Sequence, residues 1–163
     1  MLKKYLITSL LICSTSINAA VLPKKHVTSK NVVPITRKID EKQLTACILV
    51  AEAGGEGITG MKAVFEVIKT RMNQKHTSMY RVVTERYAFS CYNAYRNNPQ
   101  RFINKYKTHK FYNTALWIVN NHKGNSITSG SNYFHEKTVK PDWSKGVKPT
   151  KIIGKHLFFC IID

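Results

Sequence analysis

Apolar positions recur at helical spacing along the first two-thirds of the chain. After Asp40, which is placed to cap a helix, an apolar run extends to Ala51 and stops at the glycine pair 54–55. A second segment, about 59–73, has apolar residues at positions i, i+3, i+4, i+7 and i+11, the pattern of a helix with one buried face. These residues are Met61, Val64, Phe65, Ile68 and Met72. The pattern predicts two helices joined at the glycines.

Shorter helices and a small sheet are predicted to follow. A short helical segment is expected near 79–86, and a longer helix over about 108–122, which Gly124 would end. Near the C-terminus the segments 131–135 and 155–159 are aromatic and strand-like, and a loop with two prolines separates them. Helices followed by a small antiparallel β element near the C-terminus predict an α+β domain that is mostly helical.

The N-terminal part of the chain has no such periodicity. Residues 1–19 combine two lysines, a short apolar run and a stretch of small residues, which are the three parts of a secretory signal peptide. The apolar run is short for a membrane-spanning helix, and an uncleaved N-terminal anchor is the alternative. Residues 20–38 hold two prolines and five Lys or Arg residues, which predicts a basic flexible linker. The folded domain is therefore expected over 39–163, exported to the periplasm or cell envelope.

The charge balance narrows the choice of partner. The chain has 26 Lys and Arg against 9 Asp and Glu, a formal net charge of +17. The positive electrostatic field of such a protein favours binding to polyanions: nucleic acid, anionic lipid, or an envelope rich in carboxylates and phosphates. Because an exported protein rarely meets nucleic acid, we expect an envelope partner and no nucleic acid, with the protein acting as a monomer.

Cysteine and histidine spacing indicates no cofactor. Cys47, Cys91 and Cys160 would remain after removal of the signal peptide, so at most one intramolecular disulfide can form, and spacing does not select the pair. Cys47 lies in an apolar helical pattern that favours a buried free thiol. Six histidines are present, but neither HExxH nor a paired His/Cys spacing of the zinc kind occurs, so no metal site is predicted.

Among the nine acids, Glu52 has the surroundings of a general acid. It ends the apolar run 46–51 and precedes the glycines, which leave room for a bulky ligand. Partial burial of the carboxyl would favour its protonated form, as general acid catalysis requires. The alternative is a structural carboxylate bound by backbone amides or an arginine. Glu66, by contrast, is expected on the polar side of the second helix.

Three other acids are candidates for a second carboxyl group. Glu56 lies four residues after Glu52, but the glycines between them indicate that the helix has ended. Glu56 is therefore predicted either to cap the next helix, or to support or pair with Glu52. Glycosidases with two working carboxyls place them roughly 5 to 10 Å apart. Glu136 and Asp142 lie in the late aromatic region, from which either could approach the cleft.

Five segments, in order, resemble the SleB/CwlJ-type cell wall hydrolases, a family known from spore cortex lysis. Residues 44–57 contain the AEA-x-GE signature, and residues 60–64 with 68–72 resemble the GQ-x-AVA-x-VVLNR helix. Residues 87–91 resemble the QFS segment. The two closing motifs are matched by residues 130–135 with 141–143 and by residues 153–159. Departures from the family pattern are Met61 and Ala88, each in place of glutamine, and Lys69-Thr70-Arg71 in place of Leu-Asn-Arg.

The resemblance implies a lysozyme-like catalytic domain that acts on the glycan strands of peptidoglycan. The family's catalytic glutamate falls on Glu52, and the second acid of its signature on Glu56. One acid without an obvious partner suits a lytic transglycosylase, in which a single glutamate acts as acid and then as base. Residues in the matching segments are candidates for binding sugars, with core packing as the alternative for each. They are Phe89, Ser90, Tyr133, His135 and Trp143.

Two other functions remain as alternatives at this stage. An N-acetylmuramoyl-L-alanine amidase would cut between glycan and stem peptide, and normally needs zinc. A non-catalytic, basic wall-binding protein would not depend on the Glu52 carboxyl. The biological setting also stays open, because a periplasmic remodelling enzyme and an exported phage lysin would both suit a basic protein with a signal peptide.

Overall fold

The computed structural model describes residues 38–162. The predicted signal peptide, 1–19, and nearly all of the predicted linker, 20–38, lie outside the described residues. Within the described part, no helix combines the length and apolar character needed to cross a bilayer.

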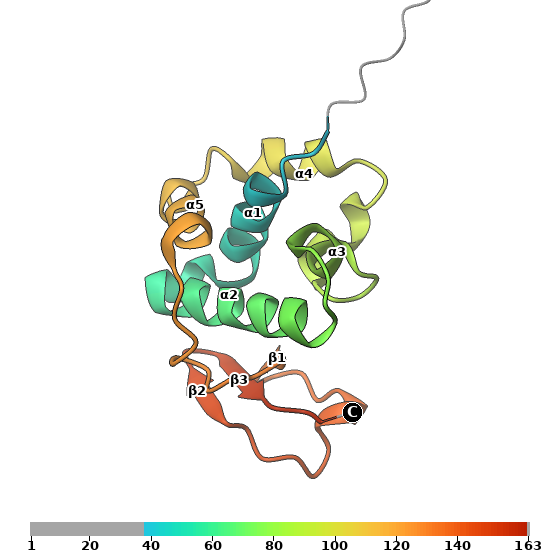
Figure 1. Cartoon of the computed structure of the whole chain (residues 1–163), viewed down its shortest axis with the longest axis vertical. Coiled ribbons are helices and arrows are strands. Elements are labelled where there is room, and N and C mark those ends of the chain that lie inside the picture. Colours follow the sequence, from blue (N-terminus) through green and yellow to red (C-terminus); the bar gives the residue numbers. More distant parts are fainter. Residues whose placement is uncertain (1–37, 163) are drawn as a thin grey trace, which may run out of the picture. The chain divides into compact units, whose positions relative to one another are not determined.

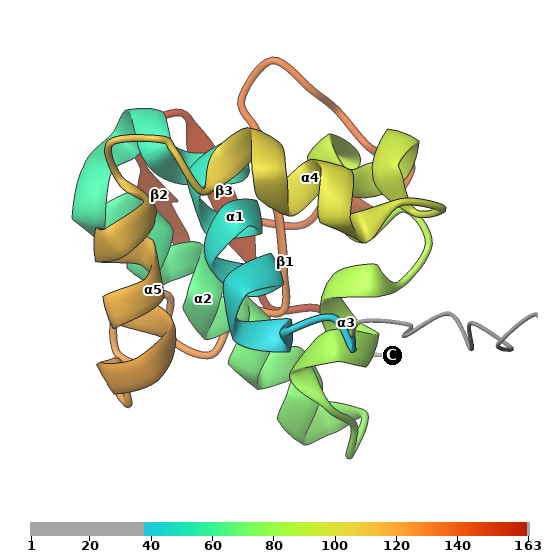
Figure 2. The same cartoon turned by 90° about the horizontal axis from the view of Figure 1, so that it is seen from above.

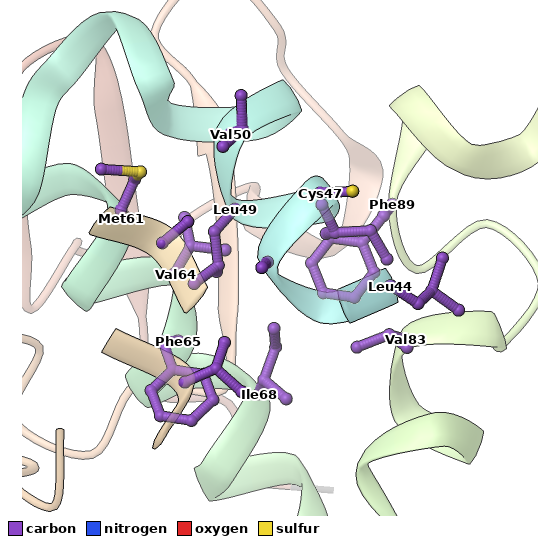
Figure 3. Close-up of a cluster of buried hydrophobic side chains, with 14 of the residues drawn as sticks. Leu44, Cys47, Leu49, Val50, Met61, Val64, Phe65, Ile68, Val83 and Phe89 are labelled. Carbon is purple, nitrogen blue, oxygen red and sulfur yellow. The ribbon is translucent and has the colours of Figure 1, made fainter. Parts of the chain in front are cut away.

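Helix α1 (Glu41–Ala53) is the central element of the helical part (Figure 1). Asp40 caps it as predicted, because its Oδ1 accepts hydrogen bonds from the backbone N–H groups of Lys42, at 2.9 Å, and Gln43, at 3.2 Å. All residues from 44 to 50 are buried, so the helix is enclosed on every side instead of burying one face. Other helices surround it, and Figure 3 shows how its side chains meet those of its neighbours.

Helix α2 (Gly57–Gln74) lies between α1 and the sheet (Figure 1). The short 3-10 helix η1 (Gly54–Glu56) joins it to α1, so the glycine break falls where the sequence predicts it. Ala63 and Val67 pack with Phe158 of the sheet. The residues of α2 that face the helical core are Met61, Val64, Phe65 and Ile68. Because both sides of α2 are covered, its buried surface is wider than the single predicted stripe.

The remaining helices complete the shell around α1 (Figure 2). Helix α3 (Met79–Thr84) lies within the predicted segment. Helix α5 (Tyr112–Asn121) is shorter than predicted, chiefly at its start, because residues 107–111 form turns and a bend instead of helix. Two further elements between α3 and α5 were not predicted. These are the 3-10 helix η2 (Ser90–Tyr95) and helix α4 (Pro99–Tyr106).

The C-terminal segment forms a three-stranded antiparallel sheet, ordered β1-β3-β2. Strands β1 (Tyr133–Glu136) and β3 (His156–Phe159) confirm the two predicted strand segments. Strand β2 (Lys151–Ile153) forms within the predicted loop, after the 3-10 helix η3 (Asp142–Ser144). The mostly helical α+β class with a small C-terminal antiparallel sheet is therefore confirmed.

All three cysteines of the described part are free. Cys47 is buried, as predicted, and burial raises the pKa of its thiol to about 12, although the charge of Lys107 acts in the opposite direction. Cys160 is exposed and Cys91 is half-buried. Stability of the described domain therefore rests on its packed core.

Candidate active site

A cavity of about 630 Å³ opens where the C-terminal end of α1 faces β1 and the turn between β2 and β3. The segment before η2 and the loop around η3 complete its walls. Its lining combines carboxyl groups, imidazoles and large aromatic rings, the mixture expected of a site that binds a polar, ring-shaped ligand. These side chains are Glu52, Glu56, Glu136, His135, His156, Tyr87, Phe134 and Trp143.

Glu52 lies in the last turn of α1 and lines this cavity. The residue is half-buried, and its Oε1 accepts a hydrogen bond from the backbone N–H of Cys91 at 3.3 Å. A Cβ added at Gly55 would meet no atom within 4 Å, so the glycine leaves open space at the rim. A carboxyl group held by one oxygen beside an open cavity has the placement that a general acid needs.

The Cys91 side chain remains a neutral thiol next to Glu52. Burial raises the pKa of this thiol well above its ordinary range, and the negative charge and hydrogen bonding of Glu52 raise it further. A thiol with a raised pKa is a poor nucleophile, because the thiolate is the reactive form. The structure thus gives Cys91 the role of holding the acid through its backbone.

Glu56 fastens the β2–β3 turn to η1 instead of presenting a second free acid. Its Oε1 accepts a hydrogen bond from the backbone N–H of Lys155 at 2.6 Å, and its Oε2 lies 2.8 Å from His156 Nδ1. The side chain makes no capping hydrogen bond to α2, so its partners are distant in sequence. Two glycines allow this close approach. A Cβ at Gly60 would lie 2.6 Å from Glu56 Cβ, and one at Gly154 would lie 2.8 Å from Glu56 Cδ.

Replacing Gly154 with alanine tests this fastening. Gly154 has φ of +54°, and the added methyl group would displace the Glu56 carboxyl from both of its partners. Gly146 is the matched control, because its φ is +76° and its added Cβ would meet nothing within 4 Å. We expect Gly154→Ala to lower the free energy of unfolding by about 1 to 3 kcal/mol more than Gly146→Ala does. Urea unfolding measures the difference, and equal losses would mean that Glu56 does not fasten the turn.

Aromatic rings form the wall of the cavity contributed by the sheet. The ring of His135 stacks on Phe159, with centroids 5.0 Å apart, and meets Trp143 edge-on at 5.4 Å. Tyr133 packs against Trp143 at 4.9 Å. His135 Nε2 is buried and has no hydrogen-bonding partner, although the residue lines the cavity. His135 and Trp143 are thus placed to contact a ligand, whereas Tyr133 lines a neighbouring hollow.

Phe89 and Ser90 have different surroundings although they are adjacent. Phe89 is 2% exposed, packs in the core around α1 and does not line the cavity (Figure 3). Its position corresponds to the core-packing alternative. Ser90 is exposed, begins η2 and lines the cavity. Of the five candidate sugar contacts, this cavity therefore brings together Ser90, His135 and Trp143.

The other candidate acids are separated by the fold. Glu136 lines the cavity, whereas the Asp142 side chain is 93% exposed and pairs with Lys145 at 2.7 Å. Glu66 does not lie on a polar face as expected. It is fully buried and binds His122 and Thr128, because the segment after α5 covers that side of α2. In the described residues, no group of three or more His, Cys, Asp or Glu side chains is arranged to hold a metal ion.

Three lining residues with polar side chains are not among the predicted candidates. Tyr87, Lys155 and His156 border the cavity, but only Tyr87 and His156 carry side chains typical of sugar sites. All three lie within segments that resemble the family motifs, so the motifs themselves could have pointed to these residues. Their orientation depends on the β2–β3 turn and on the backbone at Tyr87, which no local pattern predicts.

Two solved structures share this fold. The catalytic domain of the Bacillus cereus SleB protein is 24% identical, with a TM-score of 0.57, covering 73% of this chain and 88% of that domain. The catalytic domain of the germination-specific lytic transglycosylase SleB from Bacillus anthracis is 23% identical, with a TM-score of 0.59. The match covers 78% of this chain and 99% of that domain.

Sequence comparison identifies the family. The cell wall hydrolase family model matches residues 55–159. The chain belongs to the cell wall hydrolase family, and it is an enzyme that acts on peptidoglycan. The matched range begins just after Glu52, so the assignment of that residue rests on its geometry and on the signature around it. No curated protein matches the chain.

Proposed function

We propose that this enzyme cleaves glycan strands between N-acetylmuramic acid and N-acetylglucosamine as a lytic transglycosylase, with Glu52 as the only acid and base. One observation carries the proposal. Glu52 borders the cavity, whereas Glu56, the second acid of the signature, is bound to Lys155 and His156. A mechanism with one working carboxyl group fits this arrangement. The solved lytic transglycosylase domain from Bacillus anthracis has the same fold, which supports the choice of reaction.

In the first step, the protonated Glu52 carboxyl donates its proton to the glycosidic oxygen. The bond between that oxygen and the anomeric carbon of N-acetylmuramic acid breaks as positive charge develops on the ring. The primary hydroxyl of the same sugar then attacks the anomeric carbon and gives its proton to the Glu52 carboxylate. The products are a free N-acetylglucosamine hydroxyl and an anhydro-muramic end, and the acid is regenerated without water.

Export to the cell envelope is part of the proposal. The predicted signal peptide over 1–19 and the charge of +17 support an enzyme that works on the anionic wall. A role in wall remodelling or lysis follows from this location. Secretion of the full chain with loss of the N-terminal segment would support it, and retention of that segment would favour an N-terminal anchor.

The bond that is cut can be identified from the products. Purified peptidoglycan sacculi are digested with the protein, and the soluble fragments are separated and weighed by mass spectrometry. The proposal predicts disaccharide fragments that keep their stem peptides. Free stem peptides, lost on addition of a chelator, would instead identify an amidase, and the absence of any fragment would favour the wall-binding protein.

Hydrolysis is the second candidate reaction, and the position of Glu136 favours it. Glu136 lines the same cavity as Glu52, so its carboxyl is a possible base for a water molecule. Hydrolysis predicts reducing ends and a large loss of rate in Glu136→Gln. The transglycosylase proposal predicts that Glu136→Gln changes the rate by less than about tenfold, since general base catalysis contributes roughly a hundredfold or more.

A further inference from the structure

Tyr87 is an exposed aromatic residue in an uncommon backbone conformation. The residue is 71% exposed, and its φ is +65°. The Asn93 side chain holds this conformation, because its Oδ1 accepts a hydrogen bond from the Tyr87 N–H at 3.3 Å. The guanidinium of Arg86 lies over the tyrosine ring, 4.8 Å from its centroid. A bulky residue in the left-handed region is strained, and such strain points to a function for the side chain that it presents.

Tyr87 stands between the catalytic cavity and a second hollow. The second hollow has a volume of about 260 Å³ and shares four lining residues with the cavity, so the two are adjacent. The shared residues are Tyr87, Ala88, Phe134 and Trp143. A glycan strand that is cut inside its length must continue beyond the cavity. The second hollow offers a path past two exposed rings, Tyr87 and Trp143.

The lining of the second hollow is basic. Lys75 Nζ lies 2.8 Å from both carboxyl oxygens of Glu85, so these two charges offset each other. Arg71 and Arg86 then set the charge of the hollow. Arg71 is fixed by a hydrogen bond from its Nε to the Asn132 carbonyl at 2.6 Å, whereas Arg86 is exposed. Guanidinium groups recognise carboxylates by two parallel hydrogen bonds.

We propose that the second hollow binds a sugar that still carries its acidic stem peptide. Tyr87 stacks on the sugar ring, and Arg86 pairs with a free carboxylate of the peptide. The inference rests on the proposed function and narrows it, because it makes the enzyme specific for strands with charged stems. Stem peptides supply several carboxylates close to each N-acetylmuramic acid, so the chemistry of the substrate matches the charge of the hollow.

The test compares one substrate before and after its charge is removed. Uncross-linked glycan strands with peptide stems are used directly, or after their peptide carboxylates have been converted to carboxamides. For the wild type we expect kcat/KM to be about fivefold higher with free carboxylates, at the upper end for an exposed ion pair. Arg86→Gln should bring this ratio close to one, and Arg86→Lys should restore part of it.

Arg101→Gln is the matched control. It removes the same charge from helix α4, and Arg101 lines neither hollow, so its ratio should equal that of the wild type. The comparison separates local recognition from the general attraction of a basic protein for an anionic strand. Tyr87→Ala should raise KM about tenfold on both substrates, whereas Tyr87→Phe, which keeps the ring, should not.

Equal rates on the two substrates, or a ratio that survives Arg86→Gln, would overturn this inference and leave the proposed function standing. If the wild type released no glycan fragments from either substrate, both proposals would fall together. A ratio that fell equally in Arg101→Gln would also overturn the inference, because it would show that net charge alone sets the preference.

Discussion

Replacing Glu52 with glutamine is expected to lower kcat on peptidoglycan about a thousandfold or more, with little change in stability. The amide keeps the shape of the side chain and an oxygen that can accept the hydrogen bond from the Cys91 N–H. It cannot donate the proton that the departing sugar needs, and general acid catalysis contributes roughly a hundredfold to ten-thousandfold to a rate. The release of soluble fragments from labelled sacculi measures the loss.

Glu41→Gln is the control for this substitution. Glu41 lies at the opposite end of the same helix, and its carboxyl accepts a hydrogen bond from the Tyr80 N–H. This variant should retain wild-type activity. Activity of Glu52→Gln equal to that of Glu41→Gln would place the reaction elsewhere and refute the assigned role of Glu52.

The second large effect is expected on stability, from Glu66→Gln. The Glu66 carboxylate is fully buried in α2, where it accepts hydrogen bonds from the Thr128 N–H at 2.9 Å and the Thr128 hydroxyl at 3.0 Å. It also lies 3.0 Å from His122 Nε2. An amide cannot satisfy all of these partners, so the free energy of unfolding should fall by about 2 to 4 kcal/mol. Chemical unfolding at neutral pH measures this.

Glu66 should also make stability depend on pH. Burial acts to raise the pKa of its carboxyl, but hydrogen bonds from Thr128 and His122 outweigh burial and lower the pKa below its ordinary value of 4.5. A lowered pKa in the folded state stabilises the protein fully above 4.5, and this contribution is lost as the pH falls through the lower folded value. Glu66→Gln should therefore flatten the stability profile on the acid side.

Glu85→Gln provides the comparison for Glu66. Glu85 forms an ion pair with Lys75, and its side chain is 45% exposed. Exposed pairs contribute about 1 kcal/mol or less, so this variant should unfold at nearly the same denaturant concentration as the wild type. If the two variants lost equal stability, the buried Glu66 cluster would not anchor the segment after α5.

The sequence predicted the elements whose signals are local and strong. Helix α2 and strands β1 and β3 have periodic or aromatic patterns over their whole length. Helix α4 was missed although Asn98 caps it and Pro99 occupies its first position, because its apolar pattern covers only two turns. Strand β2 has three residues and gains its pairing only from β3.

The site was predictable where one residue stood out from its local surroundings. Glu52 follows a buried run and precedes glycines, so its position at a cavity could be inferred. The role of Glu56 could not, since its partners Lys155 and His156 lie about one hundred residues away. The burial of Glu66 was also unpredictable, because a segment after α5 covers a face that periodicity marks as polar.

Digestion in water labelled with heavy oxygen, followed by mass measurement of the new muramic ends, distinguishes transglycosylation from hydrolysis. Attack by the sugar's own hydroxyl consumes no water, so transglycosylation predicts anhydro ends that contain no label, and no such ends with Glu52→Gln. Reducing ends that each carry one labelled oxygen would contradict transglycosylation and show that water, activated by a second group such as Glu136, is the nucleophile.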